Sequence, residues 1–298
     1  PLNAGLTMRQ RTGINPYKFG LIGSTDSHNS ASLADERHIR RTVTQPPGMP
    51  QWQRDRALKS LRQSSGGLAG VWAQENTREA IFDALARRET FATTGPRIAV
   101  QFFGGWDFGA WDVGDRDAGV RDAGETNPDH AARSRLARAR GVPMGRDLPP
   151  RPEDAEAPRF FARATAEAGG AHLARMQVIK GWLGRDGQAH ERIYDIAWTH
   201  GADVDPATGV RPPQPGTVDA EAASYDNNIG KPELAAVWED PDFDAALPAW
   251  YLVRVLQIPT PRWTTYRAVA EGVEPPAGIP TAIRERAWSS PIWYTPGD

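Results

Sequence analysis

Two long runs rich in apolar and aromatic residues, joined by an Asp-Gly turn, place the strongest constraint on the fold of this chain. The runs cover residues 173–183 and 188–198, and Arg185-Asp186-Gly187 lies between them. Because Asp-Gly readily adopts the positive φ angles of a tight turn, this pattern predicts an antiparallel hairpin. Further strands are predicted at residues 97–103, 160–166 and 249–258, so residues 96–298 are expected to form a β-rich, sandwich-like domain with irregular excursions.

The first 95 residues have a different character and predict an α/β region. A short helix is expected over residues 2–12, ended by Gly13 and Pro16, and the apolar run Tyr17–Gly23 is predicted to be a buried strand of a mainly parallel sheet. Helices are expected at 51–62 and 76–89, the second with a capping box formed by Asn76 and Glu79. We therefore expect a boundary between two domains, 1–95 and 96–298.

Composition excludes several classes of protein. The chain has 35 Lys and Arg against 37 Asp and Glu, which argues against a generally basic nucleic-acid binder. No apolar run approaches the roughly 20 residues of a membrane helix, so no membrane partner is expected. The absence of Cys excludes disulfides, thiol catalysis and Cys-ligated metals, so any metal ligands must be His, Asp, Glu or other oxygen donors. The absence of a Gly-x-Ser-x-Gly elbow argues against a serine hydrolase.

Asp26-Ser27-His28 is the sharpest local feature, because it follows the predicted strand Tyr17–Gly23 directly. In an extended segment the side chains of residues i and i+2 point to one face, so this carboxylate and imidazole could bind one cation. Such ligands suit Mn, Zn or Fe. The alternative is a strand end held only by hydrogen bonds.

Basic residues offer candidate anion-binding groups. Arg37, Arg40 and Arg41 lie in a basic loop, and Arg97 follows Gly95-Pro96 at the entrance to the first predicted β-rich strand. Arg97 could bind a phosphate or carboxylate with two hydrogen bonds, or it could form an interdomain salt bridge. The 11 Trp residues are spread over the chain, which favours core packing over a sugar-binding platform.

Several segments resemble known families. Residues 18–29 are similar to the last metal-binding motif of the polymerase-and-histidinol-phosphatase (PHP) superfamily of metal-dependent phosphoesterases. Residues 67–73, 76–80, 93–98 and 285–294 resemble the bacterial domain-of-unknown-function 3604 family. The resemblance implies an α/β plus all-β protein: the C-terminal portion of a distorted (β/α) barrel with two or three divalent ions, followed by a β-sandwich-like domain. The family's opening His-x-His motif and middle ligands have no counterpart here, and a chain that starts at Pro1 fits a first half that lies elsewhere.

The resemblance also implies a function. Asp26 and His28 would be metal ligands, and Asn29 and Arg97 would lie nearby and contact a small anionic substrate. The parent protein would be a hydrolase of phosphoester-like bonds that uses Mn, Zn or Fe, whereas this chain alone would bind metal weakly or not at all. The alternative is a non-catalytic β-sandwich module that binds an unknown ligand. Members of the family are often exported, but this chain carries no targeting signal.

Overall fold

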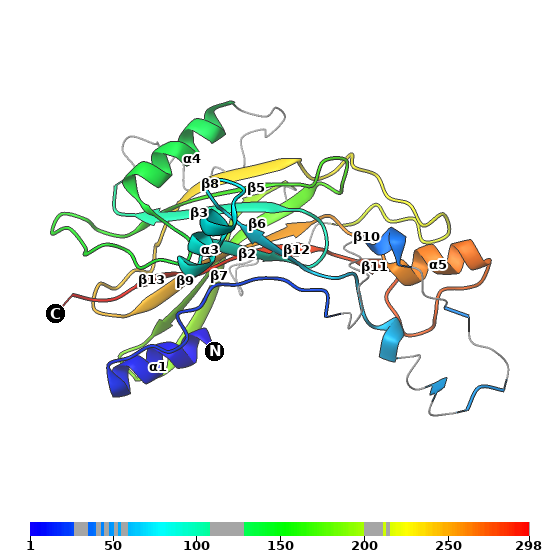
Figure 1. Ribbon diagram of the computed structural model, residues 1–298, viewed down its shortest axis with the longest axis horizontal. Helices are drawn as coiled ribbons and strands as arrows, with labels where there is room; N and C mark the ends of the chain where they lie inside the picture. The colour runs from blue at the N-terminus through cyan, green and yellow to red at the C-terminus, as the bar shows by residue number, and fades with distance from the viewer. Residues whose placement is uncertain are drawn as a thin grey trace.

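The computed structural model describes residues 1–26, 35–39, 43–44, 48–50, 53–54, 59–107, 128–199, 211–212 and 215–297. Within these ranges the strands form one large sheet, one small sheet and a two-stranded ribbon, and every strand pairing is antiparallel. The two larger sheets lie one above the other, and helices lie at the periphery (Figure 1). No described helix is both long and apolar enough to cross a membrane.

The large sheet draws its strands from both ends of the chain. Its order is β1-β2-β12-β9-β6-β7, with β13 also paired to β9. The strands are β1 (Leu68–Val71), β2 (Thr90–Thr93), β6 (Leu173–Leu183), β7 (Ala189–Trp198), β9 (Ala249–Gln257), β12 (Arg286–Ser289) and β13 (Ile292–Tyr294). Because β2 pairs with β12, strands from either side of residues 95 and 96 belong to one continuous sheet.

The predicted hairpin is confirmed as β6 and β7. Gly187 has a φ of 73°, and the Asp186 carboxylate accepts a hydrogen bond from the Gln188 amide at 3.0 Å. A left-handed conformation costs little at glycine, which explains why the turn contains this residue. The strand β6 pairs with β7 on one side and β9 on the other, and almost all of its residues are buried.

The small sheet covers the inner face of the large one. It consists of β3 (Ala99–Gly105), β4 (Val142–Pro143), β5 (Arg159–Thr165) and β8 (Glu233–Glu239), in the order β4-β3-β5-β8. Phe160 of β5 lies 5.3 Å from Phe102 of the same sheet and 4.5 Å from Tyr251 of the large sheet, measured between ring centroids. Apolar side chains from both sheets therefore share one core.

Three helices pack against the outer sides of this pair of sheets or at its edge. On the outer face of the large sheet, α1 (Leu2–Thr12) buries Leu6 against Trp250 and Trp293, and it ends as predicted at Gly13, which is left-handed. On the small sheet, α4 (Pro128–Arg140) places Ala137 against Phe103. The short helix α3 (Arg78–Ala86) lies beside β1 (Figure 1).

A separate group of elements extends from one end of the sheets. It contains η1 (Glu36–His38), the ribbon of β10 (Thr260–Pro261) and β11 (Ala282–Ile283), and α5 (Trp263–Glu271). Trp263 and Ala268 of α5 pack on Ile39 and Leu61 in a small core of their own. This end of the molecule carries the cavity described below.

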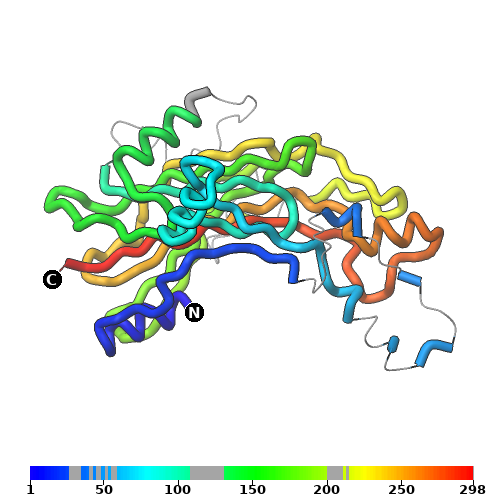
Figure 2. The backbone as a smooth tube through the Cα atoms, in the orientation of Figure 1, coloured from blue at the N-terminus to red at the C-terminus, as the bar shows by residue number. Residues whose placement is uncertain are grey.

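The prediction of a buried parallel strand at Tyr17–Gly23 is wrong. The segment forms no described strand, Phe19 and Ile22 are exposed, and it runs along the outer side of the large sheet (Figure 2). Its amides bond to isolated partners: the Leu21 amide donates to the Ser290 hydroxyl and the Gly23 amide to the Leu68 carbonyl. The backbone amides of this apolar run find hydrogen-bond partners without a ladder to a neighbouring strand. Hydrophobic periodicity alone cannot predict this arrangement.

Other predictions are corrected in detail. The helix predicted at 76–89 exists as α3, but its N-cap is Thr77, whose hydroxyl accepts from the Ala80 amide at 3.3 Å, and not Asn76. Most of the predicted helix at 51–62 lies outside the described residues. The described strands close no barrel and form antiparallel sheets, so the parallel sheet expected from the sequence is not found among them.

Candidate functional site

The predicted site residues lie in two places or outside the described chain. Asp26 is exposed and left-handed, with a φ of 47°, and its amide donates to the Ser24 hydroxyl at 3.4 Å. His28, Asn29, Arg40 and Arg41 lie outside the described residues. Arg97 is well exposed and forms an ion pair with Glu167, at 3.1 Å between Nη1 and Oε1.

Among the residues that the structure describes, no three His, Asp or Glu side chains are grouped closely enough to hold a metal ion. Asp26 is thus the one predicted ligand whose position is known. Its left-handed backbone is uncommon for a residue other than glycine, although Asp tolerates it better than most residues do.

The segment that leads to Asp26 packs on Ser65-Gly66-Gly67. The Gly67 amide donates to the Ser24 carbonyl at 3.0 Å. A Cβ atom at Gly66 would lie 2.4 Å from the Thr25 methyl, so only glycine permits this approach. The chain is therefore placed with Thr25 directly against Gly66, one residue from Ser65.

Ser65 connects this segment to a pair of buried glutamates. Its amide donates to Glu36 Oε1, and its hydroxyl donates to Glu285 Oε1 at 3.2 Å. The other oxygen of Glu36 accepts from the Trp263 amide at 2.6 Å, at the start of α5, and the other oxygen of Glu285 accepts from the Thr94 hydroxyl. Hydrogen bonds thus occupy both carboxylates, as burial requires.

The environment of Glu285 changes its acidity. Burial raises its pKa to about 7; the hydrogen bond from Thr94 works against this shift, and the nearby charge of Glu36 adds to it. The guanidinium of Arg262 is buried close by and donates to the Gln63 carbonyl at 2.6 Å. A carboxyl with a pKa near 7 can both accept and release a proton at neutral pH.

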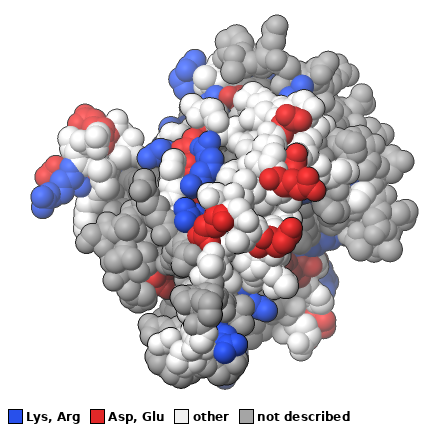
Figure 3. All heavy atoms as spheres, turned by 90° about the vertical axis from the view of Figure 1, so that its right-hand side faces the viewer, with Lys and Arg blue, Asp and Glu red and all other residues white. Residues whose placement is uncertain are grey.

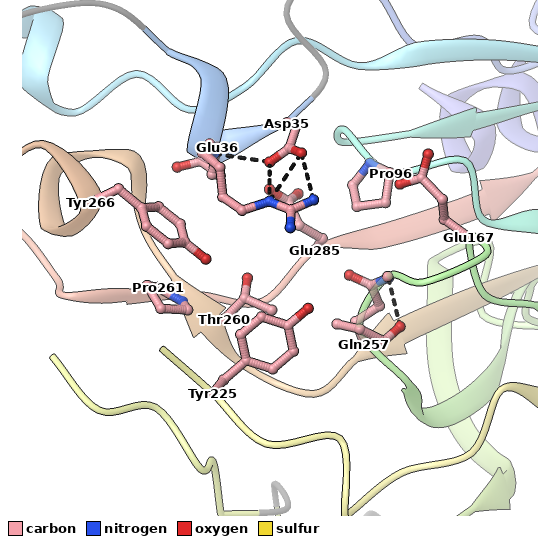
Figure 4. Close-up of a pocket in the computed structure, with 13 residues that line it drawn as sticks. Asp35, Glu36, Pro96, Glu167, Tyr225, Gln257, Thr260, Pro261, Tyr266 and Glu285 are labelled. Atoms are coloured by element: carbon pink, nitrogen blue, oxygen red, sulfur yellow. Dashed lines mark hydrogen bonds and ion pairs between the residues drawn. The ribbon is translucent and has the colours of Figure 1, made fainter. Parts of the chain in front are cut away.

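Glu36 and Glu285 also line a small cavity of about 50 Å³. The other polar side chains in its wall include Asp35, Arg37, Tyr225, Tyr266 and Gln257. Figure 4 shows the hydroxyls of Tyr225 and Tyr266 directed toward its centre. This space is enough for a few water molecules or a small oxyanion.

A fixed positive charge lies at the rim of this cavity. Arg37 forms two parallel hydrogen bonds to Asp35, Nε to Oδ1 at 3.1 Å and Nη2 to Oδ2 at 2.8 Å. Burial alone would raise the pKa of Asp35, but the bonds from Arg37 outweigh it and lower that pKa below its usual value. The remaining nitrogen of Arg37, Nη1, has no hydrogen-bond partner within the described ranges.

The two tyrosines are hydrogen-bond donors at neutral pH. Burial, followed by the proximity of Tyr225, raises the pKa of Tyr266 to about 12. Burial likewise raises the pKa of Tyr225, although the charge of Arg37 acts in the opposite direction. The cavity therefore presents two phenol donors and one guanidinium beside a carboxyl that titrates near pH 7.

The surface around this end of the molecule has no dominant charge. In the view that faces α5, Asp and Glu side chains of the described residues form several separate groups, with Lys and Arg groups beside them (Figure 3). Positive charge near the cavity therefore comes from individual side chains such as Arg37.

Sequence analysis identified only part of this arrangement. Arg37 was proposed as an anion-binding residue and lines the cavity, whereas Arg97 itself points to Glu167, a neighbouring residue of the wall. Glu36, Tyr225, Tyr266 and Glu285 were not singled out. For Glu285 a signal existed, because it begins the C-terminal segment on which the family resemblance rests; for the tyrosines there was none.

Comparison with known proteins gives one match. The sequence model of a family described as "Protein of unknown function (DUF3604)" matches residues 1–296. No curated protein and no solved structure matches the chain.

Proposed function

The chain belongs to the DUF3604 family, and from this premise we propose that it is part of a metal-dependent hydrolase that acts on phosphoester-like bonds of a small anionic substrate. The observation that best supports this proposal is the cavity in which Arg37, Tyr225, Tyr266 and Glu285 converge. A pocket that combines a few polar groups with a titratable group of shifted pKa is the usual setting of catalysis.

In this proposal the chain's own residues bind the substrate and move a proton. Nη1 of Arg37 and the hydroxyls of Tyr225 and Tyr266 bind the anionic oxygens, which hold the ester in place and balance its charge. Water forms the new bond to phosphorus as the ester bond breaks, Glu285 gives its proton to the leaving-group oxygen, and the attacking water supplies the proton that restores Glu285. The pKa of about 7 allows both protonation states of Glu285 at neutral pH.

In this proposal Asp26 and His28 would be metal ligands. When bound, Mn, Zn or Fe would supply Lewis-acid stabilisation of developing negative charge. Asp26 alone among the described residues contributes to such a site, and one carboxylate does not hold an ion tightly, so no step is assigned to the metal here. The proposal places the other ligands of a PHP-like barrel outside these 298 residues.

The rival proposal is a non-catalytic, sandwich-like binding module. It draws support from the two facing antiparallel sheets, which share one apolar core and account for most of the described strands. In that case the buried carboxyl pair would only anchor α5 and η1 to the sheets.

Metal analysis and hydrolysis assays on the full-length protein separate the two proposals. We expect bound Mn, Zn or Fe and turnover of a chromogenic phosphodiester, and the Asp26→Ala and His28→Ala variants should lose both. His190→Ala is the matched control, since His190 lies on the hairpin at the other side of the large sheet, stacked on Trp182. For the 298-residue chain alone, we expect weak metal binding and negligible turnover.

The outcomes are distinct. Full-length protein without bound metal and without hydrolysis would overturn the enzyme proposal, and variants that behave like the parent would favour the binding module. Tyr225→Phe and Tyr266→Phe should raise KM with retention of the metal, which tests the cavity separately from the metal ligands.

A further inference from the structure

The outer face of the large sheet divides into an apolar half and a cationic half. Under α1 the face is apolar, with Trp250 and Leu252 of β9 in contact with Leu6. Because alternate residues of a strand share a face, Arg254 continues the same face beyond the helix. In this second half the strands carry arginines in place of apolar residues.

Strand register places four arginines close together there. Arg254 lies opposite Trp288 of β12 and Gln177 of β6, while Arg286 and Arg175 both lie opposite Leu256. Arg286 and Arg175 are thus diagonal neighbours of Arg254, a relation in which residues lie roughly 7–8 Å apart and long side chains can still meet. Arg284 lies two residues before the start of β12. Together these four residues form what we call the arginine patch (Arg175, Arg254, Arg284 and Arg286).

The two central residues of the patch, Arg254 and Arg286, donate their hydrogen bonds to uncharged groups. Nε and Nη2 of Arg254 both donate to Gln177 Oε1, at 2.9 and 2.7 Å. Nε of Arg286 donates to the Arg284 carbonyl at 3.2 Å, and its guanidinium lies 6.0 Å from the Trp288 ring. In the described part of the chain, no carboxylate forms an ion pair with Arg254 or Arg286.

Arg175 differs from these two because it bonds to two backbone carbonyls and lies near a carboxylate. Its guanidinium donates to the carbonyls of Arg211 and Pro212, and Asp195 lies at 3.6 Å. Asp195 in turn accepts from Gln177 and from the Arg211 amide. Asp195 at the edge of the patch and Glu191 on β7 therefore offset part of its charge, while neither forms an ion pair with Arg254 or Arg286 among the described residues.

Electrostatics supports the same conclusion. Burial, followed by the charge of Arg286, lowers the pKa of Arg254, although the carboxylates of Asp195 and Glu191 act in the opposite direction. Burial, followed by the charge of Arg175, lowers the pKa of Arg284. Cations at this separation in a partly buried surface repel one another unless an anion lies between them.

We propose that the arginine patch is a binding site for the phosphate group of a small phosphorylated ligand. The guanidinium groups of Arg254 and Arg286 have nitrogens that bond to no other group among the described residues, and two such planar groups suit a tetrahedral dianion that accepts paired hydrogen bonds. A ligand with one carboxylate carries a single negative charge, which would balance only one of these two guanidinium groups. The site is separate from the cavity: Gln257 and Glu285 face the cavity, whereas Leu256, Arg284 and Arg286 alternate with them and face outward.

The proposal goes beyond the hydrolase proposed above and does not rest on it. Inorganic phosphate is the probe, titrated into the 298-residue chain and followed by ³¹P NMR and by the thermal midpoint, with potassium chloride at matched ionic strength. Phosphate also stabilises proteins without a site, but that effect is not saturable. We expect a saturable component that acetate does not reproduce.

Variants locate the site. Arg254→Gln together with Arg286→Gln should weaken phosphate binding at least about tenfold, because each substitution removes a charge-assisted hydrogen bond to the phosphate. Arg185→Gln is the matched control: it removes the same charge from the hairpin turn, where Arg185 pairs with Asp244. If the double variant does not fold, Arg286→Gln alone makes the comparison, since the Arg286 side chain donates one hydrogen bond to the part of the chain that the structure describes.

Three results would overturn the proposal. Phosphate could show no saturable binding to the parent chain, the double variant could bind it as tightly as Arg185→Gln does, or acetate could bind equally well. None of these results depends on metal or hydrolysis, so failure here leaves the proposed function to its own test.

Discussion

Replacing Glu285 by Gln is expected to abolish a pH dependence of stability that the buried carboxyl creates. The pKa of Glu285 in the folded protein is about 7, against an ordinary value of 4.5. Between these two pH values the folded state holds a proton that the unfolded state has lost. The free energy of unfolding therefore falls as the pH rises from 4.5 to 7, and above pH 7 it is lowered by the full cost of ionising the buried Glu285 carboxyl.

The magnitude follows from the size of the shift. One pKa unit corresponds to about 1.4 kcal/mol, so the difference between 4.5 and about 7 amounts to about 3 kcal/mol. Glu285 is only 3% exposed, so solvent screens little of this cost. A glutamine has nearly the same shape and never ionises, so relative to the parent the variant should gain about 3 kcal/mol between pH 4.5 and pH 8.

Urea unfolding followed by Trp fluorescence from pH 4.5 to pH 8 measures this difference. Glu167→Gln is the control, because it removes the same charge from a partly exposed carboxylate paired with Arg97. A difference between the parent and Glu285→Gln that stays constant over this pH range would refute the argument that burial beside Glu36 raises the pKa.

Three further substitutions test the fold. Thr77→Ala should cost about 0.5–2 kcal/mol, because it removes the cap on the Ala80 amide, whereas Asn76→Ala should cost little. Asp240→Asn should cost about 3–5 kcal/mol, because it removes the carboxylate that lies 2.6 Å from buried Lys180 and leaves the ammonium with the uncharged carbonyl of Asp242. Gly187→Ala should cost more than about 1 kcal/mol, because its φ of 73° strains any other residue. Chemical unfolding at pH 7 measures all three, with circular dichroism as the second probe.

Each of these predictions has a contradicting result. Equal losses in Thr77→Ala and Asn76→Ala would mean that neither side chain caps α3. A loss below about 1 kcal/mol in Asp240→Asn would show that Lys180 finds another partner; adding Lys180→Met should restore stability otherwise. For the hairpin, Gly169→Ala should cost a similar amount, since Gly169 is also left-handed and no atom lies within 4 Å of a Cβ atom at either glycine; a loss below about 1 kcal/mol in Gly187→Ala would contradict the argument from backbone strain.

Local patterns in the sequence determined much of the secondary structure. The hairpin β6–β7, the strands β3, β5 and β9, and the helices α1 and α3 were all predicted near their observed bounds. Their signals are short in range: an Asp-Gly turn, a glycine that ends a helix, an apolar period. Such signals depend on the backbone preferences of neighbouring residues, which are the same in any fold.

Strand pairing and the cavity were decided by tertiary structure. The short strands β1, β2, β12 and β13 have little pattern of their own. Pairing with β9 stabilises β12 and β13, and β2, which pairs with β1, is stabilised by pairing with β12 across some 190 residues. In the described chain, Tyr17–Gly23 bonds to this sheet at isolated points, through the Leu21 amide to Ser290 and the Gly23 amide to Leu68, and forms no strand ladder.

For the two sites, too, the sequence determined one part of the chemistry and the tertiary structure the other. From the sequence came the residue types: His and carboxylates for any metal, and arginine for an anion. Which arginines act together could not be read from it, because Arg254 and Arg286 meet through register, and Glu36 and Glu285 through the fold. A raised pKa requires burial and a neighbouring charge, and both exist only after the chain has folded.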